Sequence, residues 1–184
     1  MAITILRLGH RIFRDQRITT HCGLTARALG AKEMYYTGEH DLGMEQSLEK
    51  AAAAWGGHFR VRYLEAPGPF LRTFHGKVVH LTAYGLPFQG KLAQLRRARS
   101  LLVIVGGEKV PPEIYQRADW NLAVGSQPHS EVAALGIVLY ELTGRRFPAR
   151  FTRAKLRIVP QARGKRMEQP RSSGPAPARG KARL

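Results

Sequence analysis

Three segments of the sequence place glycine and polar residues directly after a short apolar run. They are residues 81–85 (LTAYG), 105–111 (VGGEKVP) and 124–131 (VGSQPHSE). Glycine lets backbone N–H and C=O groups come close to a ligand, and open α/β sheets bind ligands beyond the carboxyl ends of their strands. We therefore expect the three segments to form the walls of one pocket. Neither GxxxxGK[ST] nor a GxGxxG after a strand is present. The sequence therefore lacks the motifs that usually indicate binding of nucleoside triphosphates or dinucleotides.

The third segment has the pattern of a strand followed by a helix. Pro128 suits a first helical position, and a carboxylate in the first turn, here Glu131, is favoured by the helix dipole. The turn between strand and helix offers backbone donors to a polar or anionic ligand. Ser130 between His129 and Glu131 is no catalytic triad, because neighbours on one helical turn point in different directions and no GxSxG surrounds them.

Basic residues follow the first apolar run near the amino terminus. Arg14 and Arg17 lie in a polar stretch, read as a loop, that begins after Gly9. A guanidinium hardly ever loses its proton, so it suits positioning and charge stabilisation better than proton removal. Either arginine is equally compatible with a solvated charge that holds an acid such as Asp15. The 7 histidines and the single cysteine, Cys22, show no metal-ligand spacing, so we expect no metal.

Strands and helices alternate along the first 143 residues. Apolar runs that end in glycine or polar loops predict strands near residues 3–8, 34–36, 59–64, 77–84, 101–105 and 120–124. Helical patterns lie near residues 20–29, 43–55, 89–98, 112–118 and 128–142, and a Pro/Gly loop is expected at 66–70. This alternation predicts an α/β fold, with a mainly parallel sheet covered by helices on both faces.

The C-terminal part has a different composition and residue pattern. Basic and apolar residues alternate over 147–160, which predicts a short β-hairpin. From Gln161 onward Pro, Gly, Ser, Ala and Arg dominate, which is typical of a disordered tail. We thus expect three parts: a domain at 1–143, a basic hairpin at 144–160 and a disordered basic tail at 161–184.

The net charge is +17, and residues 145–184 contain 13 Lys or Arg against one acid. This charge favours a polyanionic partner, and the basic tail favours salt-dependent RNA contact. No apolar run is long enough to cross a membrane, and the start of the chain does not look like a secretory leader. We expect a cytoplasmic protein without membrane contact.

The motifs LRLGHR, RDQRITTH, HLTAYG, GGEKVPPEIY and VGSQPHSEVAAL together resemble the archaeal tRNA 2'-O-methyltransferases of the SPOUT superfamily, over about residues 3–140. The resemblance implies a trefoil-knotted α/β fold, S-adenosylmethionine as methyl donor, and a homodimer that binds tRNA across its subunits. It also implies methylation of the 2'-hydroxyl of the T-loop cytidine at position 56, with Arg17 or Arg14 as the arginine that acts. Carried over by motif, it places these residues around the cofactor: Leu81, Gly106, Gly107, Glu108, Lys109, Val110, Val124, Gly125, Ser126, Gln127, Pro128, His129, Ser130 and Glu131.

Two alternatives remain open from the sequence. A SPOUT enzyme of this kind could act on another RNA nucleotide or on a base. A catalytically silent RNA-binding protein on the same fold would share the charge but lack a pocket for a methyl donor. The three glycine segments argue against the silent protein.

Overall fold

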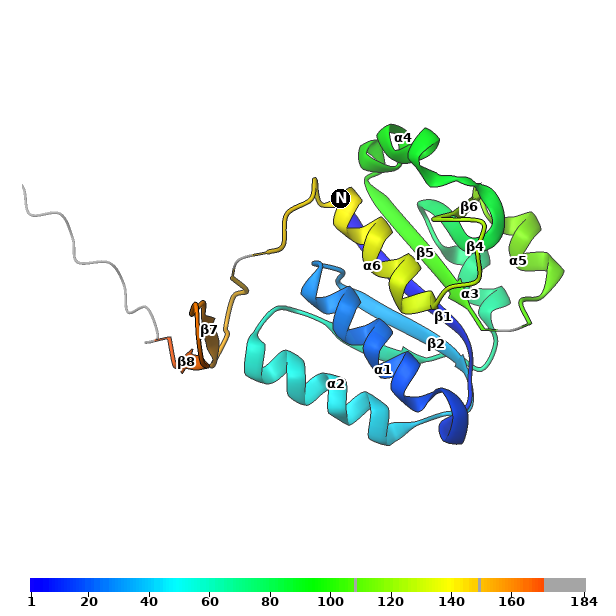
Figure 1. The fold of residues 1–184 in the computed structure, drawn as a ribbon. Coiled ribbons are helices and arrows are strands. Elements are labelled where there is room, and N and C mark those ends of the chain that lie inside the picture. Colours follow the sequence, from blue (N-terminus) through cyan, green and yellow to red (C-terminus); the bar gives the residue numbers. More distant parts are fainter. Residues whose placement is uncertain (108, 149, 171–184) are drawn as a thin grey trace, which may run out of the picture.

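The fold is a parallel sheet with helices on both faces (Figure 1). The computed structural model describes residues 1–107, 109–148 and 150–170. Its sheet has the strand order β3-β2-β1-β5-β4-β6, and all of its pairings are parallel. The strands are β1 (Ala2–His10), β2 (Glu33–Gly38), β3 (Arg60–Tyr63), β4 (Lys77–Pro87), β5 (Ser100–Gly106) and β6 (Trp120–Ala123).

Helices connect the strands and cover the sheet. They are α1 (Ile12–Ala28), α2 (Leu42–Trp55), α3 (Pro67–Thr73), the 3₁₀ helix η1 (Phe88–Lys91), α4 (Leu92–Arg97), α5 (Pro112–Arg117) and α6 (Glu131–Leu142). One buried cluster joins the sheet to α1, α2 and α6, and a second joins it to α3 and α5. Strands β1 and β5 at the centre are almost continuously buried because both of their faces are covered. None of the described helices has the length and apolar character needed to cross a membrane.

The predicted order of strands and helices is confirmed, with two corrections. Residues 66–70 were expected to be a loop, but α3 forms there, with Pro at its first turn, where the missing N–H costs nothing. Residues 11–17 were also expected to be a loop, but α1 begins at Ile12. The side chain of the N-cap residue, Arg11, makes no capping hydrogen bond to this helix. Instead, Glu39 from the loop after β2 accepts a hydrogen bond of 2.7 Å from the Ile12 N–H.

The C-terminal hairpin forms later in the chain than expected. Its strands are β7 (Arg157–Val159) and β8 (Arg166–Glu168), which pair antiparallel, so the prediction of two strands within 147–160 is wrong. The residues before β7 pack against helix ends instead. Phe151 lies under the guanidinium of Arg27 at 5.0 Å, and the Gly57 N–H donates to the carbonyl of Thr152 at 2.9 Å.

The expected disordered tail at 161–184 is also corrected in part, because β8 lies within it. A left-handed glycine, Gly164 (φ 90°), lies between the two strands, a conformation that glycine adopts at no steric cost. Residues 171–184 lie outside the part of the chain that the structure describes.

Candidate active site

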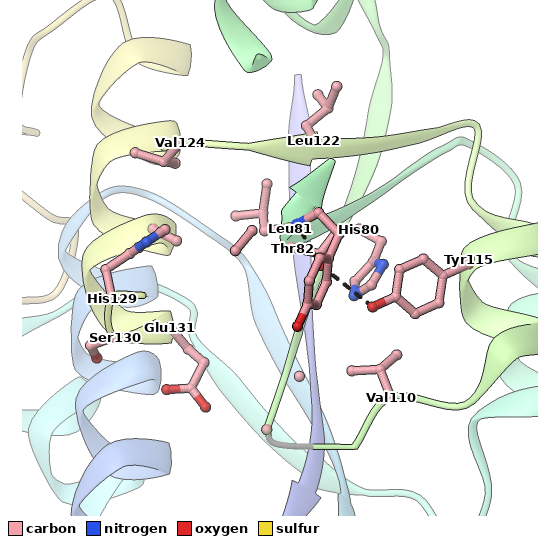
Figure 2. A pocket seen from close by; sticks show the side chains of 15 residues that line it. His80, Leu81, Thr82, Val110, Tyr115, Leu122, Val124, His129, Ser130 and Glu131 are labelled. Carbon is pink, nitrogen blue, oxygen red and sulfur yellow. Dashed lines mark hydrogen bonds between the residues drawn. The ribbon is translucent and has the colours of Figure 1, made fainter. Parts of the chain in front are cut away.

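A cavity of about 310 Å³ lies beside the middle of strand β4 and at the carboxyl ends of β5 and β6 (Figure 2). The segment 80–84 forms one wall, residues that follow β5 form the second, and the start of α6 forms the third. Leu122 and Val124 add apolar surface from β6 and the residue after it. The three glycine-marked segments therefore meet at one cavity, as parallel strands with neighbouring carboxyl ends require.

The wall formed by β4 contains a buried polar network. His80 is 1% exposed, and its Nδ1 lies 2.9 Å from the side-chain oxygen of Asn121 in β6. The Asn121 side chain donates in turn to the carbonyl of Tyr115 at 2.9 Å, and the edge of the Tyr115 ring packs against His80. Burial lowers the pKa of His80 below its usual 6.5, although the Asn121 hydrogen bond opposes this shift. His80 is therefore neutral in the folded protein at neutral pH.

This lowered pKa makes the stability of the protein depend on pH. The unfolded imidazole takes up a proton near its ordinary pKa of 6.5, whereas the folded one resists protonation, so stability is lost as pH falls below 6.5. We expect the free energy of unfolding of the wild type to fall more than that of His80→Gln between pH 7 and about pH 5. Urea unfolding at several pH values measures this difference. The exposed His58→Gln variant is the control, and an equal pH dependence in all three proteins would contradict the expectation.

The segment after β5 comes close to the cavity through its glycines. A Cβ added to Gly106 would lie 2.2 Å from Cγ2 of Val110, so even alanine would force that side chain to move. A Cβ added to Gly107 would lie 3.5 Å from Nη1 of Arg7, a side chain that is 1% exposed behind the cavity wall. The two glycines thus give the cavity its backbone-lined side.

Ser130 caps helix α6, and the helix starts at Glu131 rather than near Pro128 as the sequence suggested. The Ser130 hydroxyl accepts from the Val132 N–H at 3.2 Å, which is a typical N-cap hydrogen bond. His129 lies before the cap, with its Nδ1 2.6 Å from the carbonyl of Gln127. The expectation of a strand, a turn and a helix start holds, with the first helical residue three positions later.

The structure brings many, but not all, of the predicted cofactor residues to this cavity. Those that line it are Leu81, Gly106, Gly107, Val110, Val124, His129, Ser130 and Glu131. Those that do not are Lys109, Gly125, Ser126, Gln127 and Pro128, and Glu108 lies outside the described residues. The first group retains its cofactor role as a prediction. The residues of 125–128 are exposed and belong to no helix or strand.

Several lining residues were missed by sequence reasoning. They are His80, Tyr115, Leu122 and Ala134. Thr82, Ala83 and Tyr84 also line the cavity, and they belong to the segment 81–85 that was expected to form one of its walls. Tyr115 lies in α5 and Ala134 in the second turn of α6, and nothing in the local pattern marks either residue as facing a cavity.

The two candidate catalytic arginines do not line the cavity. Arg14 and Arg17 are exposed on the first turns of α1, and their spacing of three residues places them on neighbouring parts of one helix face. Asp15 between them is held by Arg11 at 2.8 Å, so it is Arg11 that forms this ion pair. The hydrogen bond from Arg11 lowers the pKa of the Asp15 carboxyl more than the charges of Arg7 and Arg14 do, and burial opposes the shift.

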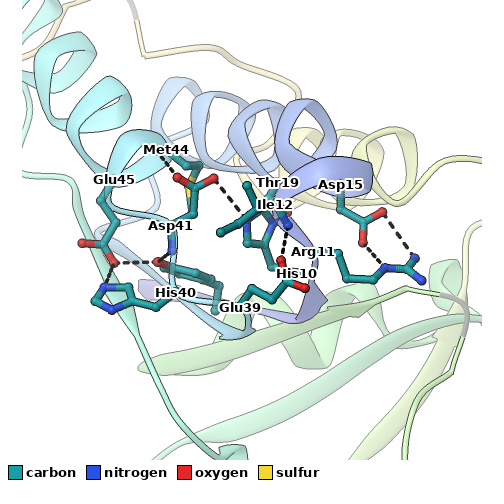
Figure 3. Close-up of polar contacts among 11 residues, drawn as sticks. His10, Arg11, Ile12, Asp15, Thr19, Glu39, His40, Asp41, Met44 and Glu45 are labelled. Atoms are coloured by element: carbon teal, nitrogen blue, oxygen red, sulfur yellow. Dashed lines mark hydrogen bonds and ion pairs between the residues drawn. The ribbon is translucent and has the colours of Figure 1, made fainter.

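A second cavity, of about 450 Å³, lies beyond the ends of β1 and β2. Gly107 lines both cavities, and Arg11 and Lys109 supply cations to the second. The adjoining His10 is fully buried and fixed by Thr19 at 2.9 Å and Asp41 at 3.3 Å (Figure 3). The two cavities thus adjoin at the loop after β5. No group of three or more His, Cys, Asp or Glu side chains within the described residues is arranged to hold a metal ion.

Solved structures of several RNA-modifying enzymes share this fold. The A. aeolicus TrmH/SpoU tRNA modifying enzyme matches with a TM-score of 0.56 at 18% identity, over 78% of this chain and 75% of that one. An rRNA methyltransferase from Sinorhizobium meliloti gives 0.61 at 18% identity, over 80% and 57%. The SpoU methyltransferase AviRb from Streptomyces viridochromogenes, in complex with AdoMet, gives 0.56 at 15% identity, over 79% and 57%. The fold is that of the SPOUT methyltransferases, as the sequence predicted.

Sequence relatives identify the family within this class. The family model described as tRNA ribose 2'-O-methyltransferase, aTrm56, matches residues 55–168. A relative from Archaeoglobus fulgidus is 47% identical over 91% of this chain and 98% of its own length. A relative from Thermococcus kodakarensis is 45% identical over 91% and 97%. Both are named tRNA (cytidine(56)-2'-O)-methyltransferase. The chain belongs to the aTrm56 family of tRNA ribose 2'-O-methyltransferases.

Proposed function

We propose that this protein transfers a methyl group from S-adenosylmethionine to the 2'-hydroxyl of the cytidine at position 56 of tRNA. The observation that carries the proposal is the cavity beside the middle of β4 and at the carboxyl ends of β5 and β6, in a chain whose relatives carry this activity in their names. A catalytically silent RNA-binding protein would not need such a cavity. Action on tRNA agrees with the net charge of +17, and we propose on the same ground that the protein works in the cytoplasm.

The residues of the cavity fit a nucleoside cofactor. A volume of about 310 Å³ is at the lower end of the usual range for small-molecule sites. Leu81, Leu122 and Val124 offer apolar surface for a base, and Ser130 and Glu131 offer polar atoms. The glycines at 106 and 107 let the backbone come close to the ligand. When bound, S-adenosylmethionine supplies an electrophilic methyl group on a positively charged sulfur.

The chain itself must position and activate the ribose. The 2'-oxygen has to lie in line with the methyl group, and its developing charge has to be stabilised as the proton leaves. The exposed face of α1 that carries Arg14 and Arg17 supplies the guanidinium groups for this role. Because neither arginine lines the cavity of its own chain, we propose that each serves the cavity of a second copy in a homodimer. A phosphate or water then takes the proton.

The decisive experiment compares two forms of the tRNA. Purified protein is incubated with labelled S-adenosylmethionine and an unmodified tRNA, and the product is mapped by nuclease digestion. We expect label at position 56, and no label on a tRNA that carries dC56, which lacks the 2'-hydroxyl but keeps the base. Label that persists on the dC56 tRNA would indicate a base methyltransferase. Label elsewhere would indicate another nucleotide, and none on either would leave the silent RNA-binding protein.

We propose that the C-terminal part of the chain contacts tRNA phosphates. A cavity of about 760 Å³ between the ends of α1 and α2 and residues 147–158 is lined by four arginines and no carboxylate. The boundary between this part and the SPOUT domain, which we expect near residue 143, coincides with the end of α6 at Leu142. The tail at 171–184 adds four further Lys or Arg and no acid.

Removing the tail should change how tRNA binding depends on salt. Truncation after Pro170 keeps both hairpin strands and removes four cations. Because each phosphate contact releases counterions, we expect weaker binding and a smaller slope of log K against log salt. Fluorescence anisotropy with labelled tRNA from about 50 to 200 mM salt measures this slope. A full-length chain with neutral glutamines at the same four positions should behave like the truncation, and an unchanged slope in both would rule out the tail's role.

A further inference from the structure

Arg7 is a buried cation behind the wall of the cavity. It lies in β1 with 1% of its surface exposed, and one of its terminal nitrogens donates to the carbonyl of Leu8. Its other terminal nitrogen lies 3.6 Å from a carboxylate oxygen of Glu131. Its Nε is buried and has no hydrogen-bond partner among the described residues. A guanidinium in this position keeps its charge and requires a counter-charge nearby.

Glu131 connects this buried charge to the cavity. Its side chain is 25% exposed, it lines the cavity, and Figure 2 shows its carboxylate extending from the first turn of α6 toward the open space. Gly107 lines the same cavity, and a Cβ added to it would come into van der Waals contact with the Arg7 guanidinium. The pair therefore joins a carboxylate at the cavity surface to a cation directly behind it.

We propose that Arg7 and Glu131 together set the preference of the cavity for a positively charged ligand over a neutral one. Glu131 attracts the sulfonium of the methyl donor, and Arg7 limits this attraction. The two side chains together therefore set how much more tightly the charged donor binds than the neutral thioether product. Glu131 is thus a specificity residue, and Arg7 is a positioning residue that acts through it. The inference rests on the proposed function, because it takes S-adenosylmethionine as the ligand.

The donor and the product differ in one feature that isolates this effect. S-adenosylmethionine carries a sulfonium charge, whereas S-adenosylhomocysteine has a neutral sulfur and otherwise shares the nucleoside and the amino acid. A loss of packing at Arg7 or Glu131 weakens both ligands alike. A change in local charge alters the ratio of the two dissociation constants, and a tenfold change in this ratio corresponds to about 1.4 kcal/mol.

The test measures this ratio by calorimetry in the wild type and in three variants. Glu131→Gln leaves the buried Arg7 charge uncompensated, so the preference for the charged donor should fall about tenfold. Arg7→Met leaves the Glu131 carboxylate unopposed, so the preference should rise by about threefold or more. The double variant removes both charges and should return to within about threefold of the wild-type ratio. If Arg7 and Glu131 had only a structural role, their two variants would not shift the ratio of dissociation constants in opposite directions.

Two controls complete the experiment. Glu113 is exposed in the first turn of α5, and its side chain does not line the cavity. Glu113→Gln should therefore leave the ratio unchanged. Arg7→Lys keeps the buried charge and should stay closer to the wild-type ratio than Arg7→Met. If Arg7→Met does not fold, the comparison of the ratio in Glu131→Gln with that in Glu113→Gln still tests the inference. A ratio that stays constant within about twofold in Glu131→Gln overturns the inference.

The outcomes also separate this inference from the proposed function. If the wild type binds both ligands but the ratio does not respond to the charge changes, only the inference is wrong. If the wild type binds neither S-adenosylmethionine nor S-adenosylhomocysteine, the proposed cofactor is wrong and the inference fails with it. Shifts of the ratio in the same direction for both single variants would also overturn the inference.

Discussion

Replacing Arg17 by alanine should lower kcat for tRNA methylation by about two orders of magnitude or more, because one donor to a developing charge is typically worth that much. Arg17 is exposed and does not line the cofactor cavity. The affinity for S-adenosylmethionine should therefore stay within about twofold of the wild-type value. Single-turnover methylation gives the rate, and calorimetry gives the affinity. Arg14→Ala should have an effect in the same direction.

Two further variants test whether the effect is specific to the guanidinium of Arg17. Arg17→Lys keeps the charge but loses the planar fork of the guanidinium, so it should recover only part of the rate. Lys50→Ala removes an exposed cation from α2 and should leave kcat unchanged. Turnover that survives in both Arg14→Ala and Arg17→Ala would show that neither arginine acts in catalysis.

Mixing two inactive variants tests whether the arginine serves the other subunit. Gly106→Val should disable the cavity, because Val110 already occupies the space beside this glycine. If each arginine serves its partner's cavity, every mixed dimer contains one intact site. After equal mixing with Arg17→Ala about half of all dimers are mixed, so about a quarter of the wild-type activity is restored. If each arginine serves its own cavity, no mixed dimer has an intact site. Activity that stays absent after verified exchange of subunits would therefore contradict the arrangement across subunits.

Replacing Gly85 by alanine should lower the free energy of unfolding by more than about 3 kcal/mol, since the new methyl group would overlap backbone rather than a movable side chain. A Cβ at this position would lie 2.6 Å from the backbone N and C of Leu122 and 2.7 Å from the carbonyl carbon of Asn121. Strand β4 pairs with β6 on both sides of this point, with a register shift between Leu81 and Leu86. The two strands would have to separate at the cavity, so S-adenosylmethionine binding should be lost as well.

Gly125→Ala is the matched control for Gly85→Ala. Gly125 lies just beyond β6 and was expected at the cofactor, but an added Cβ there would meet no atom within 4 Å and its φ is not left-handed. We expect its free energy of unfolding to stay within about 1 kcal/mol of the wild type. Urea unfolding measures both variants. Equal stability of the two variants would show that the close crossing of β4 and β6 does not require glycine.

The sequence alone was sufficient for the order of the six strands of the parallel sheet along the chain and for the three segments that meet at the cavity. Strands such as 101–105 are predicted by continuous apolar runs, and Gly106 and Gly107 mark where the chain leaves β5. These signals are local, because hydrophobic period, proline and glycine act over a few residues. The family resemblance came from the same segments, and the fold class that it implied is the one found.

Only the tertiary structure decided which side chains lie together. The start of α1 depends on a carboxylate from the loop after β2, and the β4 wall of the cavity depends on His80 meeting Asn121 and Tyr115. The partner of Arg7 is Glu131, from the other end of the domain. No local pattern of residues indicates these pairings, because each joins residues that become neighbours only when the parallel strands align and their carboxyl ends meet at one edge of the sheet.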